Sequence, residues 1–260
     1  MSRVRALWPL LTALHRYDKS FSTRGRGQGT LIDAPILAYL LETPSGRLLV
    51  DVGCDYRKLV EPALGAPWYE RPECPLPRPQ MSDEQRIPRY LERLGLSTRD
   101  VDAVLLTHLH FDHAGGLDDF AHADVHLHER ELSAAREPAD SAYFGDETLP
   151  RAQFRLHPGD FSPCPGVTLV ETPGHTAGHF SVLLELERGR PVLLAGDAAD
   201  LCENLDDEVA PGLCYRDDPE PALASIRKLK QLARDSGAEL WPNHDLAFLR
   251  RQRPFPRSYP

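Results

Sequence analysis

The chain has 260 residues, of which 41% are hydrophobic, and a formal net charge of −9 at pH 7. This length and apolar content suffice for one buried core, so we predict a single domain over residues 1–260. The negative charge, with no basic block to offset it, argues against a nucleic-acid partner, and no apolar stretch is long enough to cross a bilayer.

The cysteines and the N-terminus predict a cytoplasmic location. The five cysteines are an odd number and include no C-x-x-C pair, which is typical of reduced thiols. They are Cys54, Cys74, Cys164, Cys202 and Cys214. The apolar run of residues 6–14 resembles a weak secretory signal, but Pro9 interrupts it and residues 15–18 do not form a small-residue cleavage site.

Short apolar runs predict β-strands along the whole chain. These runs cover residues 36–41, 48–52, 101–106, 167–170, 180–186 and 192–195. Residues 43–46 form a predicted hairpin turn between the first two strands. Residues 61–79 contain six prolines, which we interpret as a surface loop or lid within the domain.

Two helices are predicted between or after these strands. The spacing of Ser82 and Gln85 matches a capping box before an apolar stripe that stops at Gly95, and Pro88 should kink this helix or delay its start. A second helix is predicted from an N-cap at Asp218 to a stop at Gly237. Two batches of strands, each followed by helices, predict two packed sheets with helices outside.

Three histidines and an aspartate occupy six positions directly after the strand 101–106. They are His108, His110, Asp112 and His113. Because alternate residues of an extended segment point the same way, His108 and His110 can converge on one metal ion. A turn at Asp112 would direct that carboxylate and His113 toward a second ion, and two glycines at 115 and 116 permit the sharp turn.

Further donors follow later strands. His175 comes after the strand 167–170, Asp197 after the strand 192–195, and His244 after an apolar segment at 239–241. Functional side chains of α/β folds commonly lie in loops that follow strands. The sequence therefore predicts a metal site built from the 108–113 cluster and these three residues.

The other histidines have a simpler interpretation. His126 and His128 alternate on a predicted strand, but no acid and histidine follow them, so we interpret them as a solvated strand face. We interpret His15, His122 and His157 in the same way. His179 either orients a group near His175 or simply begins a strand.

The pattern H-x-H-x-D-H, followed by P-G-H, G-D and a final histidine, resembles the metallo-β-lactamase superfamily. The resemblance implies an α/β (α+β) fold, an αββα sandwich of two mixed sheets flanked by helices, which binds two divalent metal ions. It places His108, His110 and His175 at the first ion, Asp112, His113 and His244 at the second, and Asp197 between them. Zinc suits this donor set, with iron, manganese or cobalt as alternatives.

The implied mechanism is metal-dependent hydrolysis of an ester. A hydroxide that bridges the two ions would attack the substrate carbonyl, because bound cations lower the pKa of water. Asp112 would pass a proton to the departing alkoxide. Asp112 and Asp197 are therefore the predicted catalytic residues.

Several segments resemble the N-acyl-homoserine lactone lactonases, the quorum-quenching enzymes, over most of the chain. These segments are residues 38–43, 49–53, 81–84, 108–116, 203–204, 207–209 and 218–223. The resemblance implies a lactone ester as substrate. The lactonases typically have a substrate-positioning tyrosine three residues after the bridging aspartate, and this chain has Asp200 there. We predict Phe111 and Asp200 as substrate contacts, although a solvated loop residue is an equal interpretation of Asp200.

Three alternatives stay open. Another lactone or carboxylic ester fits the same chemistry, and so does a thioester, as in hydroxyacylglutathione hydrolases, although only a short segment follows His244. A metal-binding sensor or scaffold without turnover is the alternative outside enzymes. Candidate apolar contacts for an acyl chain lie at residues 7–11, 68–69 and 143–144, with core or lid packing as the simpler interpretation. The partner is a small molecule, and a homodimer is among the allowed oligomeric states.

Overall fold

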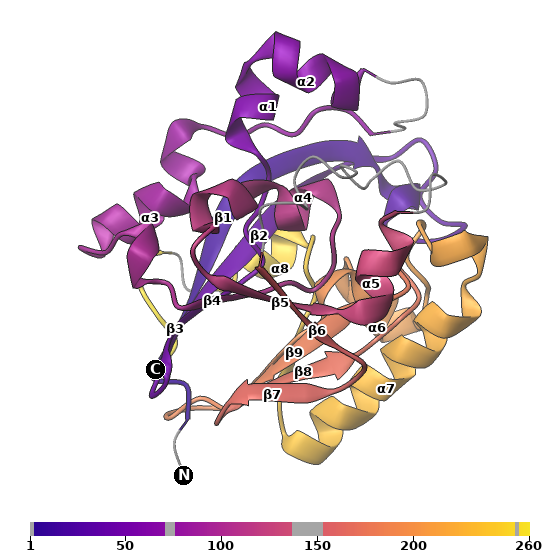
Figure 1. Ribbon diagram of the computed structural model, residues 1–260. Helices are drawn as coiled ribbons and strands as arrows, with labels where there is room; N and C mark the ends of the chain where they lie inside the picture. Colours follow the sequence, from indigo (N-terminus) through magenta and orange to yellow (C-terminus); the bar gives the residue numbers. More distant parts are fainter. Residues whose placement is uncertain (1–2, 71–75, 137–152, 253–254) are drawn as a thin grey trace.

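Two β-sheets pack face to face in the computed structural model, which describes residues 3–70, 76–136, 153–252 and 255–260 (Figure 1). The first sheet has the order β1 (Ala6–Asp18), β2 (Leu31–Thr43), β3 (Gly46–Val50), β4 (Ala103–Leu105), β5 (Asp124–His128), β6 (Gln153–His157). The second has the order β11 (Glu239–Trp241), β10 (Val192–Leu194), β9 (Phe180–Leu184), β8 (Val167–Glu171), β7 (Phe161–Cys164). Each sheet contains parallel and antiparallel pairs, so the predicted mixed sheets are confirmed.

Helices cover both outer faces of the sandwich, whereas the short helix Leu246–Leu249 packs against the core between the sheets. The α-helices are α1 (Tyr56–Val60), α2 (Pro62–Tyr69), α3 (Ile87–Arg93), α4 (Phe111–Ala114), α5 (Glu129–Ala134), α6 (Cys202–Asp207), α7 (Glu220–Ser236) and α8 (Leu246–Leu249). Short 3-10 turns occur at Lys19–Phe21, Asp83–Gln85, Thr98–Asp100, Gly115–Phe120, Gly196–Ala198 and Tyr215–Asp217. Among these helices, none combines the length and apolar character that a bilayer crossing requires.

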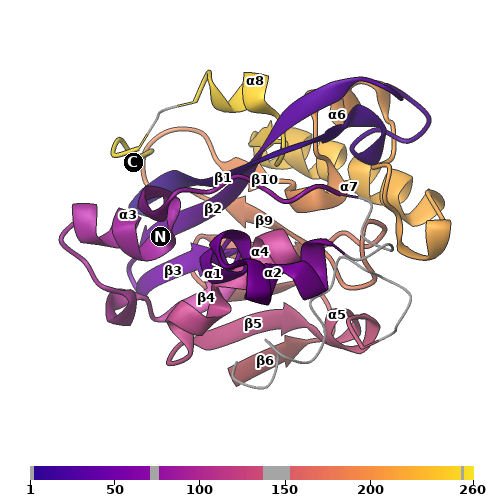
Figure 2. The same ribbon diagram turned by 90° about the horizontal axis from the view of Figure 1, so that it is seen from above.

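Strand alternation divides the apolar side chains into three layers. Val50, Leu105 and Leu194 belong to the core between the sheets. The neighbouring Leu193 points outward and packs with Ile226 of α7, since successive strand residues face opposite sides. Figure 2 shows the outer helices from above, with α3 and α7 on different sides of the molecule. The predicted αββα arrangement is confirmed.

The long helix α7 ends at the predicted Gly237 but begins one residue later than predicted, because Pro219 and not Asp218 is its N-cap. The Asp218 carboxylate accepts a hydrogen bond from the backbone N–H of Glu220, the first helical residue. Gly237 ends the helix with φ of 68° in the left-handed region, which glycine adopts without steric cost. The other predicted helix starts late, at Ile87, with Pro88 in its first turn, where the missing N–H needs no partner.

One strand was not predicted and one local expectation was wrong. Residues 6–14, which the sequence analysis did not assign to an element, are part of β1, which pairs with β2 at the edge of the first sheet, and Pro9 is tolerated because an edge strand need not donate every N–H. The segment 61–79 is not only a loop, since Pro62 opens the helix α2 at a position that suits proline. Tyr69 of α2 packs edge-on against Phe111 at 5.7 Å between ring centroids, and this tertiary contact helps to stabilise a proline-rich helix.

Candidate metal centre

The seven predicted donors meet where loops from both sheets converge. His108 and His110 lie in the extended segment after β4, and Asp112 and His113 form the first turn of α4. From the second sheet come three residues in the loops that follow β8, β10 and β11, namely His175, Asp197 and His244. None of the seven is more than 8% exposed.

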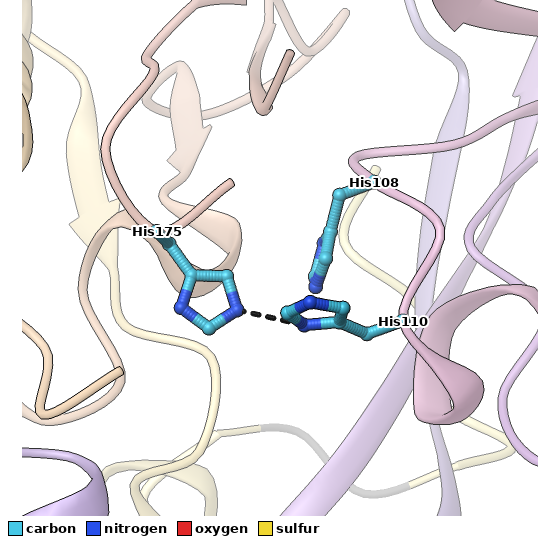
Figure 3. A group of neighbouring side chains, drawn as sticks. All are labelled: His108, His110 and His175. Carbon is cyan, nitrogen blue, oxygen red and sulfur yellow. Dashed lines mark hydrogen bonds between the residues drawn. The ribbon is translucent and has the colours of Figure 1, made fainter. Parts of the chain in front are cut away.

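Three imidazoles form the first group. The potential ligand atoms of His108, His110 and His175 all lie within 4.8 Å of one another. Figure 3 shows the three rings pointing toward a common space, although His175 comes from a different sheet than the other two. The nitrogen atoms His175 Nε2 and His110 Nδ1 are 3.0 Å apart. A cation placed between such rings would receive three nitrogen ligands, a usual number for a protein-bound zinc ion.

The second group joins a carboxylate to two imidazoles. The potential ligand atoms of Asp112, His113 and His244 also lie within 4.8 Å of one another. Asp112 Oδ2 is 3.8 Å from His113 Nε2 and 3.9 Å from His244 Nε2. The structure therefore brings these three side chains together as the sequence predicted.

Asp197 lies between the two groups and presents one oxygen to each. Its Oδ2 is 3.7 Å from His108 Nε2 and 3.4 Å from His175 Nε2. Its Oδ1 is 3.2 Å from both His113 Nε2 and His244 Nε2. A carboxylate in this position can serve both groups at once.

Asp51 and Thr107 orient two of the histidines, and sequence reasoning did not identify either as a site residue. Asp51 accepts hydrogen bonds from the Thr107 hydroxyl and from His113 Nδ1, the latter at 2.8 Å. Because the Thr107 proton goes to Asp51, His108 Nδ1 donates to Thr107 Oγ1 at 3.0 Å. Both rings then turn Nε2 toward the centre, and this is the nitrogen that can bind a metal.

Backbone carbonyls orient two more rings. His244 Nδ1 donates to the carbonyl oxygen of Pro35 at 2.8 Å, and His175 Nδ1 donates to that of Leu213 at 3.1 Å. Because Nδ1 makes this bond in each ring, Nε2 is the nitrogen that faces the centre. No side-chain pattern could reveal these contacts, because any residue supplies a carbonyl.

His179 and Asn243 hold the central aspartate. His179 is fully buried, and its Nε2 accepts a hydrogen bond from the backbone N–H of Asp197 at 3.0 Å. Asn243 Nδ2 donates to Asp197 Oδ1 at 2.8 Å. His179 thus orients Asp197, a group near His175, as one of its two interpretations proposed.

The electrostatics of the centre favour positive charge. Burial lowers the pKa of His244, but Asp197 and the other nearby carboxylates outweigh it and raise that pKa to about 10. Burial also lowers the pKa of His113, but nearby carboxylates, Asp197 above all, raise it above the usual value. Burial opposes ionisation of Asp197, yet His113 and His244 hold its pKa well below the usual value. Carboxylates that stabilise positive charge so strongly suit a cation site.

The donor chemistry fits divalent metal ions. The Nε2 atoms of His108 and His113 are buried and have no hydrogen-bond partner among the described residues. Unsatisfied buried polar atoms are rare in native proteins and point to an unseen ligand. Imidazole and carboxylate donors together are typical of zinc and related transition metals.

The buried residue Glu131 joins the two metal-binding loops and escaped the sequence analysis. It is fully buried, and its carboxylate accepts hydrogen bonds from the backbone N–H groups of Leu109 and Gly178, each at 3.0 Å. Gly178 permits this approach, because a Cβ there would lie 2.3 Å from the Glu131 backbone nitrogen. Glu131 therefore fixes the first histidine pair relative to the loop that carries His175.

We expect Glu131→Ala to lower the free energy of unfolding by about 2–4 kcal/mol, because it leaves two buried donors without an acceptor. Urea denaturation of the metal-free protein measures this loss. Glu129→Ala, on the exposed face of the same helix, is the matched control and should change stability by less than about 0.5 kcal/mol. Equal stability of the two variants would contradict the role of Glu131.

Two of the histidines outside the site were predicted to be solvated but are buried. His128 is fully buried and not on a solvated face, because its ring packs on Phe180 and bonds to Glu171. His15 is 2% exposed and packs edge-on against Phe111. His122 is exposed as expected, while His126 and His157 stack on each other and are partly exposed.

The predicted substrate contacts are both buried beside the centre. Asp200 is 4% exposed, so its interpretation as a solvated loop residue was wrong. Burial and the neighbouring Asp197 raise the pKa of Asp200 to about 7. Phe111 belongs to an apolar cluster with Ile36 and Leu59, against which Trp68 and Tyr69 pack.

The remaining candidates for acyl-chain contact divide into two cases. Leu7 and Leu10 are fully buried in the core, which confirms the simpler interpretation for them. Residues 143–144 lie outside the described part of the chain, as does Cys74. The other four cysteines carry free thiols.

Comparison with known proteins agrees with this geometry. The family model described as the metallo-beta-lactamase superfamily matches residues 31–244. An N-acyl homoserine lactonase of Bacillus sp. is 36% identical over 228 residues, 88% of each chain. The N-acyl homoserine lactonase AiiA of Bacillus thuringiensis subsp. kurstaki is 35% identical over 228 residues, again 88% of each chain.

Solved structures extend the likeness to the whole fold. A mutant of B. thuringiensis AiiA with N-decanoyl-L-homoserine at its active site superposes with a TM-score of 0.89 at 32% identity, covering 99% of this chain and 100% of that one. An N-acyl homoserine lactone hydrolase carrying the product N-hexanoyl-L-homoserine at its catalytic metal centre gives the same TM-score, identity and coverage.

Proposed function

Because the chain belongs to the metallo-beta-lactamase superfamily, we propose that it hydrolyses the ester bond of a lactone, with N-acyl homoserine lactones as the substrate class. Two relatives that share 88% of its length are N-acyl homoserine lactonases, and one solved relative holds the product N-hexanoyl-L-homoserine at its metal centre. The cytoplasmic location and the oligomeric state stay predictions.

The observation that carries the proposal is the position of Asp197 between two groups of donors. In the proposed assignment His108, His110 and His175 hold one divalent ion, Asp112, His113 and His244 hold the other, and Asp197 is shared. Zinc is the proposed metal, with iron, manganese or cobalt as alternatives. When bound, such ions supply Lewis acidity and lower the pKa of water.

The chain's own residues then position the reactants and move the proton. Asp112 is the most exposed of the seven donors, at 8%, so its carboxylate is the one best placed to meet substrate. It would take a proton from the attacking water and pass it to the alkoxide that leaves when the lactone ring opens. Phe111, next to Asp112, offers an apolar surface to the substrate and helps to exclude water from the centre.

A pH-drop assay with metal-loaded protein tests the proposal. The substrates are N-acyl homoserine lactones of several acyl lengths, simple aliphatic lactones and S-lactoylglutathione. We expect acid release from the acyl homoserine lactones at a higher kcat/KM than from the other substrates, and none from metal-stripped protein. Turnover of the thioester without any lactone opening would favour the hydroxyacylglutathione alternative. A protein that binds both ions and turns over no substrate would favour a sensor or scaffold.

A further inference from the structure

The Asp200 carboxylate is buried in an unusual state. Its residue is 4% exposed, and its Oδ1 has no hydrogen-bond partner in the described part of the chain. The Ser22 hydroxyl is a polar neighbour of the carboxylate. Among the described lysines and arginines, none forms an ion pair with Asp200. An ionised carboxylate in such surroundings is costly unless a cation or a hydrogen-bond donor compensates it.

The unsatisfied carboxylate lies beside the second group of donors. One potential ligand atom from each of Asp197, Asp200 and His244 lies within 4.8 Å of the other two. His244 also belongs to the group with Asp112 and His113. The backbone fixes this arrangement, since the His244 N–H donates to the Asp200 carbonyl oxygen at 2.8 Å. Asp200 is therefore tied directly to a residue of the second group.

We propose that Asp200 is an eighth metal ligand and serves the ion held by Asp112, His113 and His244. The unpartnered Oδ1 then has the cation that its burial requires. This ion would have three carboxylate donors, from Asp112, Asp200 and the shared Asp197, whereas the first ion would have three imidazoles and only the shared carboxylate. Because oxygen donors suit manganese better than imidazoles do, the second position should accept Mn²⁺ more readily than the first.

The proposal rests on the metal centre of the proposed function but not on its lactone substrate. The typical lactonase tyrosine at this position can donate a hydrogen bond, whereas an ionised aspartate cannot. A carboxylate contributes charge and a ligand oxygen in its place. Metal binding can therefore test Asp200 even if the substrate class proves different.

The first experiment is metal titration of Asp200→Asn, which keeps the side-chain size and removes the charge. Zinc and manganese are titrated in competition with a chelator of known affinity, and the Mn²⁺ electron paramagnetic resonance spectrum is recorded. We expect the first ion, held by His108, His110 and His175, to be retained. The affinity for the second ion should fall by at least about 10- to 100-fold, the loss that a change outside the ligand set already causes, and the loss should be larger for Mn²⁺ than for Zn²⁺. Unchanged affinities and an unchanged spectrum would overturn the proposal.

Two controls separate ligation from a structural role. Asp206→Asn changes an exposed carboxylate six residues away and should retain both ions. Ser22→Ala removes the polar neighbour of Asp200, so a loss of metal as large as that of Asp200→Asn would show that the contact with Ser22 matters and not the ligand oxygen, which would overturn the proposal. Unmodified protein that binds both ions but hydrolyses no lactone would count against the proposed function and not against the ligand role of Asp200.

A measurement on the unmodified protein covers the case in which Asp200→Asn does not fold. A crystal structure of the Mn²⁺-loaded chain should place an Asp200 carboxylate oxygen at about 2.0–2.2 Å from the second ion. A separation beyond 3 Å with the ion present would overturn the assignment.

Discussion

Asp197→Ala is expected to abolish hydrolysis and to leave the protein unable to retain two ions per chain. Asp197 faces both groups of donors, with one oxygen 3.4 Å from His175 Nε2 and the other 3.2 Å from His113 Nε2. Without this carboxylate, cations held at the two positions lose the negative charge that offsets their mutual repulsion. Loss of about 4 kcal/mol of charge stabilisation in the transition state lowers the rate constant roughly a thousandfold. We therefore expect kcat/KM of Asp197→Ala to fall by at least roughly a thousandfold.

Metal analysis after gel filtration and the pH-drop assay together measure this effect. The unmodified chain should carry two ions and Asp197→Ala fewer than two. Asp206→Ala, an exposed aspartate outside the centre, is the control and should match the unmodified chain in both measurements. Retention of both ions by Asp197→Ala would refute the shared position of this carboxylate.

Asp51→Ala is expected to reduce both stability and metal affinity. Asp51 is 2% exposed and accepts hydrogen bonds from the Thr107 backbone N–H and from His113 Nδ1, each at 2.8 Å. Its removal leaves these buried donors without an acceptor, which should cost about 3–5 kcal/mol of unfolding free energy. His113 also loses the contact that orients its ring, so metal affinity should fall by about 10- to 100-fold.

Urea denaturation of the metal-free protein and chelator competition measure the two effects separately. Asp51→Asn is the informative control, because its amide oxygen can still accept one hydrogen bond and should restore part of the stability. A variant Asp51→Ala that unfolds like the unmodified chain would contradict the orienting role.

The site could be predicted because its donors are dense in the sequence and follow strands. His108, His110 and Asp112 lie within one short segment, and the period of an extended chain already indicates which of them share a side. His175 and His244 were found because each follows an apolar strand. The same reasoning predicted the two sheets, since strand alternation is a local property of the chain.

The supporting residues could not be predicted in this way. Asp51 and Glu131 look like ordinary acidic residues, and only the parallel pairing of β3 with β4 brings Asp51 beside Thr107. Pro62 and its neighbours resemble a loop, but packing against Phe111 stabilises them as part of α2. Local propensity was overridden wherever a distant segment supplied the stabilising contact.

The sequence by itself determined the kinds of donor, their order and the strand ends at which they stand, because these depend on residue type and on the repeat of the backbone. Only the tertiary structure decided which donors share a space, which ring nitrogen faces it, and that Asp200 is buried rather than solvated. Those properties arise from contacts between residues far apart in the chain, such as His113 with Asp51 and His244 with Pro35. Burial and hydrogen bonding of a side chain are set by the segments packed around it, which its own neighbours in sequence do not specify.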